Sequence, residues 1–361
     1  MTIVTVPLSG NRYQIHIADG LLDRAGPLLR KLPCQVGKAV VITDTTVGKH
    51  YGERLQQSLA LAGYQPLLIE VTPGEAQKSL TTAGQIYEKL SEFKIERATP
   101  ILALGGGMVG DLAGFVAATY QRGQPLIQVP TTLLAQVDSS IGGKCAINHG
   151  HIKNKIGLFY QPRLVICDPQ LLQTLPKREI GSGLGEVIKY GMILDQRLFR
   201  YLECQMPDIL AGDASKRELV IARCASIKAR LVAKDEHDHG LRQLLNFGHT
   251  VGHAIESVSA FGLTHGEAVA LGMMIASRMA MRLGRLPEEQ LRRLGELIVR
   301  AGLPTALPET FSIPLILDFM AHDKKITAAK IKFILPCRIG KGFITDAVSP
   351  TLVEETLRQS L

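Results

Sequence analysis

The sequence contains no tryptophan, and aromatic residues make up only 5% of its 361 residues. Proteins that bind single-stranded nucleic acid stack the bases on aromatic side chains, so this scarcity argues against such a function despite a formal net charge of +8. The basic residues also form no continuous tract. We therefore expect the positive charge to attract small anionic substrates rather than nucleic acid.

Long apolar runs and paired cysteines are missing as well. No stretch approaches the roughly 18 consecutive apolar residues of a membrane helix, and residues 1–20 lack the basic and apolar regions of a secretory signal. The six cysteines include no C-x-x-C pair, which favours free thiols in a reducing compartment. We expect a cytoplasmic protein with no membrane partner, in which any metal ion has nitrogen and oxygen ligands.

The pattern of the first half predicts a parallel β-sheet. Hydrophobic residues make up 46% of the chain and charged residues 20%, a globular balance, and the length favours two domains. Apolar runs of strand length occur at 40–43, 67–71, 101–104, 126–129 and 164–167, with amphipathic segments at 47–62 and 79–93. Because the runs are continuous rather than alternating, helices should cover both faces of the sheet. A Rossmann-like, doubly wound α/β domain over residues 1–178 is the prediction.

The second half has almost no strand signal. Apolar residues recur at three- and four-residue spacing in the segments 182–204, 208–234, 246–259, 265–283 and 287–301. This spacing predicts an all-helical second domain over residues 179–361.

A glycine-rich loop follows the apolar run that ends at Leu104. Gly105, Gly107 and Gly110 satisfy the G-x-G-x-x-G pattern, which holds a pyrophosphate on backbone amides at a helix N-terminus. The acidic residue expected about 20 positions later is absent, since that segment reads LIQVPTT. Asp44 or the loop 73–78 could supply the ribose-binding carboxylate instead, and a plain tight turn stays open as an alternative.

Histidines cluster in the second half. His249 and His253 lie four residues apart on one predicted helix face, and His265 opens the next helical segment. Upstream, Glu186 and Lys189 share a helix face. Two histidines and a glutamate would leave open coordination positions on a divalent metal, the pattern of a catalytic site. The spacing leaves open which two histidines bind, and also that all three are core or capping residues.

Eight segments taken together resemble a known family. They are GEAQKSL, GGGMVGDLAGF, QVPTTLLAQVDSSIGGKCAIN, KNKIG, FYQP, GLGEVIKYG, LRQLLNFGHTVGHAIE and HGEAVALGM. In this order, over nearly the whole chain, they resemble the 3-dehydroquinate synthase family of sugar phosphate cyclases. The resemblance implies an N-terminal NAD-binding α/β domain and a C-terminal helical domain with metal and substrate groups.

The resemblance also implies a role for individual residues. The metal, zinc or cobalt, would be bound by Glu186, His249 and His265. NAD would be bound by Asp44, Glu75, Lys78, Gly107, Met108, Val109, Gly110, Asp111, Thr131, Thr132, Lys144, Lys153, Leu171, Leu172, Gln173 and Thr174. Substrate and catalysis would involve Asp138, Lys144, Asn154, Lys189, Lys228, Arg242, Asn246, His253 and Lys324. Arg122 would reach the substrate phosphate of the neighbouring subunit, which implies a homodimer.

The reaction implied is the conversion of 3-deoxy-D-arabino-heptulosonate 7-phosphate to 3-dehydroquinate and phosphate in the shikimate pathway. It proceeds by transient oxidation, phosphate elimination, reduction and aldol closure, so that NAD is regenerated. One alternative keeps the fold and changes the substrate, giving another NAD- and metal-dependent sugar phosphate cyclase. A metal-dependent polyol dehydrogenase is a more distant alternative.

Overall fold

The computed structural model describes residues 1–150, 152–259, 262–327 and 331–361, with the side chains of 322–327 left out of the description. These residues form two compact units. The first comprises 1–175 and 217–237, and the second comprises 176–216 and 238–361. Helix α8 (Ala214–Lys234) belongs to both, since its residues from Arg217 onward group with the first unit. The division of the chain into an NAD-binding domain (1–178) and a metal- and substrate-binding domain (179–361) stays a prediction.

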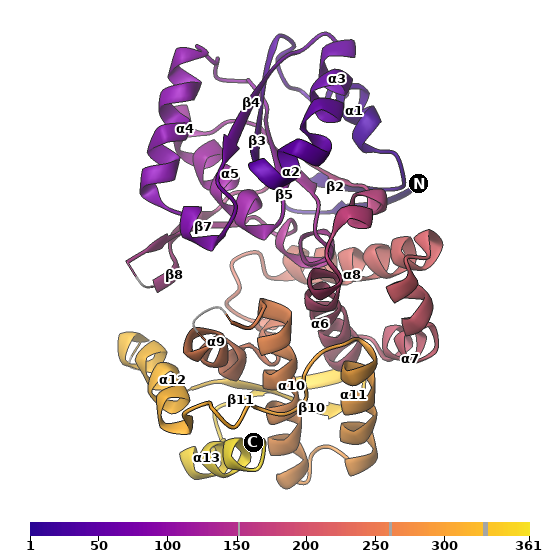
Figure 1. Ribbon diagram of the computed structural model, residues 1–361, viewed down its shortest axis with the longest axis vertical. Helices are drawn as coiled ribbons and strands as arrows, with labels where there is room; N and C mark the ends of the chain where they lie inside the picture. Colours follow the sequence, from indigo (N-terminus) through magenta and orange to yellow (C-terminus); the bar gives the residue numbers. More distant parts are fainter. Residues whose placement is uncertain (151, 260–261, 328–330) are drawn as a thin grey trace. The chain divides into compact units, whose positions relative to one another are not determined.

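A seven-stranded sheet forms the centre of the first unit (Figure 1). Its order is β1-β2-β9-β6-β5-β3-β4, and all neighbours are parallel except β1 and β2. The strands are β1 (Thr2–Val6), β2 (Tyr13–Ile17), β3 (Lys38–Asp44), β4 (Gln65–Val71), β5 (Ile101–Gly105), β6 (Leu126–Pro130) and β9 (Leu164–Cys167). The five predicted strands correspond to β3, β4, β5, β6 and β9, so the predicted parallel sheet is confirmed.

Helices cover both faces of this sheet, as the continuous apolar runs predict. On one face Val41 and Leu102 pack with α1 (Ala25–Leu29) and α3 (Glu53–Leu61). On the other, Val40 and Ile101 pack with α4 (Leu80–Glu92) and α5 (Gly107–Thr119). Figure 1 shows α3 and α4 on opposite sides of the strands. Shorter elements are η1 (Leu22–Arg24), α2 (Thr45–Val47), η2 (Gly48–Gly52), η3 (Glu75–Gln77), η4 (Tyr120–Arg122), η5 (Ala135–Ser139), η6 (Pro169–Thr174) and the hairpin strands β7 (Lys144–His149) and β8 (Ile152–Phe159).

The second unit is largely helical, with one addition that the sequence did not predict. Its helices are α6 (Lys177–Leu194), α7 (Gln196–Ala211), η7 (Leu241–Asn246), α9 (His249–Val258), α10 (His265–Arg282), α11 (Glu288–Arg300), α12 (Ile313–Thr327) and α13 (Pro350–Arg358). The addition is an antiparallel hairpin, β10 (Phe333–Arg338) and β11 (Lys341–Thr345), turned at Gly340 with φ of +85°. The prediction of an all-helical second domain is therefore wrong for this segment. A short apolar run has no periodicity that distinguishes a strand from a helix.

Helix α10 is the centre of the second unit. It packs against α6, α9, α11 and β10, and 13 of its 18 residues are buried, so it has no polar face of the kind that a surface helix shows. Among the helices of the described residues, none has the length and apolar character that crossing a membrane requires.

Glycines let α10 approach its neighbours at backbone distance. A β-carbon on Gly272 would lie 1.9 Å from the carbonyl oxygen of Gly248, at the start of α9. A β-carbon on Gly266 would lie 2.0 Å from the carbonyl oxygen of Ser182, on α6. The Ser182 hydroxyl also accepts a hydrogen bond of 3.0 Å from the Gly266 amide. The three helices therefore meet where no larger residue fits.

We expect Gly272→Ala to lower the free energy of unfolding by about 1–3 kcal/mol, since the obstructing atom is a backbone oxygen that cannot rotate away. The matched control is Gly84→Ala in α4, where a β-carbon meets nothing within 4 Å. That control should raise stability by about 0.5–1 kcal/mol, as alanine replaces glycine in an open helix position. Urea titrations followed by circular dichroism measure both. Equal stability of the two variants would contradict the packing described.

Candidate functional site

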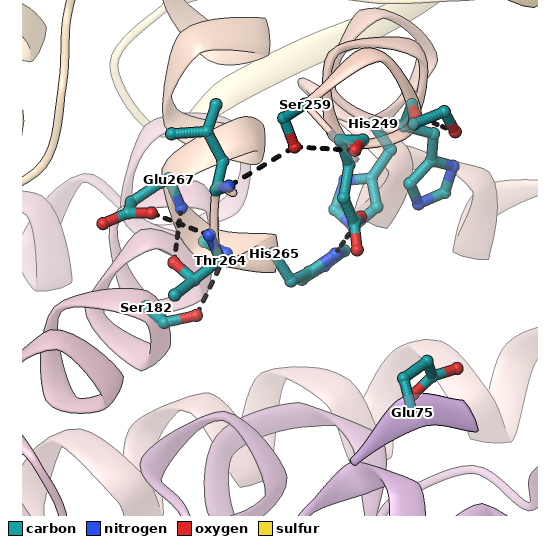
Figure 2. Close-up of polar contacts among 12 residues, drawn as sticks. Glu75, Ser182, His249, Ser259, Thr264, His265 and Glu267 are labelled. Atoms are coloured by element: carbon teal, nitrogen blue, oxygen red, sulfur yellow. Dashed lines mark hydrogen bonds and ion pairs between the residues drawn. The ribbon is translucent and has the colours of Figure 1, made fainter. Parts of the chain in front are cut away.

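The start of α10 is held in place by a local network. The Thr264 hydroxyl accepts from the Glu267 amide at 3.3 Å, and the Glu267 carboxylate accepts from the Thr264 amide at 2.7 Å, a reciprocal capping box. Arg178 of α6 donates twice to the same carboxylate, at 2.8 and 2.7 Å. Figure 2 shows that His265, the first residue of α10, projects away from this network. The network therefore fixes the backbone of His265 independently of the contacts that its ring makes.

His265 lies with His249 and Glu186 in one cluster. One nitrogen or oxygen atom from each of the three residues lies within 4.8 Å of the others, close enough to bind one metal ion. The Nε2 atoms of His249 and His265 are 3.4 and 3.6 Å from Glu186 Oε1. The Glu186 side chain has no exposed surface. Helices α6, α9 and α10 contribute one side chain each to the cluster, and their glycine contacts set the separation of the three helices.

Hydrogen bonds at the far side of each ring orient both imidazoles. His249 Nδ1 is 3.1 Å from the carbonyl oxygen of Phe247, which can only accept, so the proton lies on Nδ1. His265 Nδ1 lies 3.2 Å from Glu256 Oε2. Both rings consequently turn Nε2 toward Glu186. This is the orientation that metal-binding histidines adopt when their second nitrogen donates elsewhere.

The charges around the cluster give the two histidines different pKa values. Burial, together with the Lys189 ammonium, holds the pKa of His249 well below its usual range, so this ring is neutral, the form that binds a metal. Burial also lowers the pKa of His265, but hydrogen bonds to Glu186 and Glu256 outweigh it and raise the pKa to about 9. Lys189 itself is buried and pairs with Glu186. One carboxylate and two imidazoles fit a divalent ion with open coordination positions.

His253 stands beside this cluster and is exposed. Its ring centre lies 5.2 Å from that of His249 and 5.9 Å from that of His265. The described cluster thus contains Glu186, His249 and His265, the set that the family resemblance implies, while the pair with four-residue spacing does not form it. Assignment of these residues as metal ligands stays a prediction.

In the first unit, the glycine loop joins β5 to α5. Gly106 precedes the first turn of α5, and a β-carbon there would lie 2.9 Å from Thr132 Cγ2. A β-carbon on Gly107 would lie 3.2 Å from Ser139 Oγ. The Gly105 carbonyl accepts from the Thr131 amide at 3.0 Å. The loop is a strand-to-helix turn with bare backbone amides at a helix N-terminus, suited to a phosphate.

A buried lysine, Lys78, follows η3 and contacts Asp111 in the first turns of α5. Lys78 Nζ donates to Asp111 Oδ2 at 2.8 Å, lies 3.4 Å from Glu75 Oε1, and contacts Asn154 Oδ1. Asn148 Nδ2 donates to the same Glu75 oxygen at 3.0 Å. The carboxylates outweigh burial and raise the pKa of Lys78, whereas burial raises the pKa of Asp111. Four residues predicted from the resemblance are thus brought together.

A second ion pair joins two other predicted residues. Lys228 Nζ donates to Asp138 Oδ1 at 2.6 Å and to the Asp138 carbonyl at 2.8 Å. Both belong to the first unit, although Lys228 lies on α8, far along the sequence. The Lys228 side chain is only 7% exposed, so its ammonium is held by this pairing rather than by water.

Several predicted residues have structural roles that the sequence did not show. Asp44 Oδ1 accepts from the Thr46 and Val47 amides at 2.9 and 3.0 Å, so Asp44 caps α2. The side chains of Leu171 and Leu172 are buried in the protein interior. Thr132 Oγ1 accepts from the Ala135 amide at 3.1 Å.

The remaining predicted residues differ in exposure. Thr131 and Arg242 are buried, and Met108, Lys153 and Asn246 are half-buried. Arg122, Lys144 and Gln173 are exposed. Thr174 Oγ1 lies 2.7 Å from the Tyr51 hydroxyl. Lys324 falls within α12, and its side chain is outside the described residues.

Sequence reasoning did not single out Glu256, which the structure joins to His265. A signal was present, because Glu256 follows His249 by seven residues and His253 by three, spacings that share a helix face. The spacing alone does not say that this face meets α10.

Comparison with known proteins gives the family. The family model described as 3-dehydroquinate synthase N-terminal matches residues 68–182, and the model described as 3-dehydroquinate synthase C-terminal matches residues 183–326. The chain belongs to the 3-dehydroquinate synthase family. A curated 3-dehydroquinate synthase of Dehalococcoides mccartyi is 48% identical over 96% of this chain and 96% of its own length.

Solved structures of related sugar phosphate cyclases share the fold. A 2-epi-5-epi-valiolone synthase from Streptomyces hygroscopicus, with NAD+ and Zn2+ bound, has a TM-score of 0.90 and 28% identity over 98% of both chains. A 2-deoxy-scyllo-inosose synthase, in complex with carbaglucose-6-phosphate, NAD+ and Co2+, has a TM-score of 0.91 and 27% identity over 100% of both chains. The resemblance to the 3-dehydroquinate synthase family, and the fold that it implies, are therefore confirmed.

A double-mutant cycle tests the ion pair of Lys78 and Asp111. Lys78→Met should destabilise the protein because it leaves a half-buried carboxylate without its ammonium, and Asp111→Asn should destabilise it because it leaves a buried ammonium without that carboxylate. The double variant should lose less than the sum, by a coupling of about 0.5–3 kcal/mol in the free energy of unfolding from urea titration. Additive losses would mean that the two side chains are energetically independent.

Proposed function

We propose that this chain is a 3-dehydroquinate synthase that converts 3-deoxy-D-arabino-heptulosonate 7-phosphate to 3-dehydroquinate and phosphate. The observation that carries the proposal is the cluster of Glu186, His249 and His265 in a chain 48% identical, over 96% of both lengths, to a curated enzyme of that name. The enzyme is accordingly a carbon–oxygen lyase that depends on NAD and a divalent metal.

Glu186, His249 and His265 would hold the metal, zinc or cobalt, since their atoms lie within 4.8 Å of one another. When bound, the metal would polarise the oxygen of the substrate carbon that is oxidised, and NAD would take up a hydride there and later return it. Lys189 pairs with Glu186 in the interior, where its positive charge adds to burial in lowering the pKa of His249, so that this ring is neutral.

NAD would bind in the domain of residues 1–178, with its pyrophosphate on the amides of 107–111 at the N-terminus of α5. Lys78 and Glu75 would fix polar groups of the cofactor, with Thr131, Thr132, Lys144 and Lys153 as further contacts. Asp44 keeps its second carboxylate oxygen for a ribose hydroxyl, because both capping bonds go to Oδ1. Leu171, Leu172, Gln173 and Thr174 complete the proposed set.

The substrate carries a phosphate and a carboxylate, and the chain supplies cations for both. Arg242 suits a carboxylate because its planar guanidinium can donate two parallel hydrogen bonds, and this residue is only 2% exposed. Lys228, held by Asp138, presents a compact charge. Lys144, Asn154, Asn246 and His253 would position the phosphate, which itself would remove the proton in the elimination. Lys324 is a further candidate for the active site.

We further propose a homodimer in the cytoplasm. Arg122 is exposed at a turn with a positive φ of 70°, a position from which it can serve a neighbouring copy. The Arg122 of the partner subunit would contact the substrate phosphate. All six cysteines are free thiols, which suits a reducing compartment.

The alternative is another NAD- and metal-dependent sugar phosphate cyclase. It is less favoured, since the two such enzymes compared above share 27% and 28% identity with this chain, against 48% for the 3-dehydroquinate synthase.

The direct test incubates the metal-loaded protein with 3-deoxy-D-arabino-heptulosonate 7-phosphate and substoichiometric NAD. We expect many phosphates released per NAD without accumulating NADH, because the hydride is returned in each cycle, and 3-dehydroquinate identified by mass. Glu186→Gln is the matched control and should release almost none. No phosphate release from folded, metal-loaded protein would favour the alternative cyclase, and steady NADH formation with a polyol would favour a dehydrogenase.

The ligand assignment predicts different outcomes for the two histidines of α9. His249→Ala should lose most of the bound zinc, because one of three protein ligands is removed. His253→Ala should keep its zinc and lose turnover, since His253 lies outside the cluster. Metal content of each purified variant by atomic emission, with circular dichroism to verify folding, checks this. Full zinc retention in His249→Ala would refute the assignment.

A further inference from the structure

The two ring nitrogens of His265 have different partners. Nε2 lies 3.6 Å from Glu186 Oε1, within the cluster, and Nδ1 lies 3.2 Å from Glu256 Oε2, outside it. Glu256 is not a member of the cluster that could hold a metal. Its carboxylate therefore contacts the side of the imidazole that a metal would not occupy.

The surroundings of Glu256 make this contact strong. Its side chain is only 13% exposed, so the carboxylate and the imidazole interact with little competition from water. His249 provides an internal comparison, because its Nδ1 is satisfied by a backbone carbonyl, a neutral acceptor, at 3.1 Å. Of the two rings, His265 alone has a carboxylate behind it. A carboxylate acceptor makes Nε2 a stronger electron donor than a carbonyl does.

The contact also joins two helices. Glu256 lies on α9, two turns after His249, whereas His265 begins α10. Helix α9 thus supplies one ring of the cluster and orients the second from a different helix. The His265 ring cannot turn about its side-chain bonds without breaking this contact.

We propose that Glu256 is a positioning residue for the metal site. It fixes the His265 tautomer with the proton on Nδ1 and directs Nε2 at the metal, and its negative charge increases the affinity of the site for a dication. This inference rests on the proposed function, in that it takes Glu186, His249 and His265 as the ligands.

The experiment measures Co2+ binding to the full-length, chelator-stripped protein by competition with a chelating indicator. Glu256→Gln keeps an oxygen acceptor and removes the charge, while Glu256→Ala removes both. Glu289→Gln is the matched control, since Glu289 is an exposed acid of α11 paired with Arg292. Visible absorption of the Co2+ form reports ligand geometry, and urea unfolding of the metal-free proteins reports stability.

We expect Glu256→Ala to weaken Co2+ binding by about 10- to 100-fold and to alter the visible spectrum, Glu256→Gln to weaken it less, and Glu289→Gln to stay within twofold of wild type. Wild-type affinity and spectrum in both Glu256 variants would overturn the proposal. So would lowered metal-free stability with unchanged affinity, the result of a merely structural role. If Glu256→Ala fails to fold, Glu256→Gln decides.

Failure of the proposed metal site gives a different result. In that case the wild-type protein binds no stoichiometric Co2+, or His249→Ala binds it as tightly as wild type does. Wild-type binding that is lost in His249→Ala and unchanged in the Glu256 variants would overturn the positioning role alone.

Discussion

The close approach of α6, α9 and α10 is the constraint on which the cluster depends. The three helices touch at Gly266 and Gly272, where a side chain would meet a backbone oxygen at 2.0 or 1.9 Å. Because interiors are close-packed and resist small displacements, contacts of this kind fix the helix separations to a fraction of an ångström. Glu186, His249 and His265 then extend from fixed backbones toward one another. The packing of the three helices thus determines the geometry of the site more than the interactions among its polar side chains do.

Burial and the neighbouring charges together determine the protonation states once the geometry is set. Glu186 has no exposed surface and pairs with Lys189, and burial, together with the Lys189 charge, lowers the pKa of His249 and keeps it neutral. His265 has two carboxylates near it and a pKa raised to about 9. A dication bound at this point would replace the proton on His265 Nε2. The His249 ring, already neutral, would need to lose no proton. Similar logic holds in the first unit, where Lys78 lies between Asp111 and Glu75.

Much of the fold could be predicted from the sequence, because its signals are local. Strands β3 and β5 are apolar runs that end in turn residues, and α10 is apolar over most of its length. The sequence does not predict the hairpin of β10 and β11, since the short apolar run before Arg338 has no period and its pairing with Lys341–Thr345 depends on the tertiary structure. The sequence offers Asp44 as a ligand-binding carboxylate, whereas its capping of α2 is evident only from the hydrogen bonds to Thr46 and Val47.

The candidate site shows the same limit. Four-residue spacing puts His249 and His253 on one face of α9, but it cannot say which ring reaches a glutamate on α6. The family resemblance supplied that choice. The spacing does not distinguish Glu256, because its contact with His265 depends on α9 facing the start of α10. The spacing of residues in a sequence rarely identifies a residue that acts through a second side chain. A candidate metal ligand can at least be recognised by its residue type.

The most direct test of this account is a pair of crystal structures, one of the metal-free protein and one of the zinc-loaded protein. If helix packing holds the ligands in advance, the coordinating atoms of Glu186, His249 and His265 should move by less than about 0.5–1 Å between the two. Ligands that lie apart in the metal-free crystal and assemble only with zinc, with α9 or α10 displaced by about 2 Å or more, would contradict it.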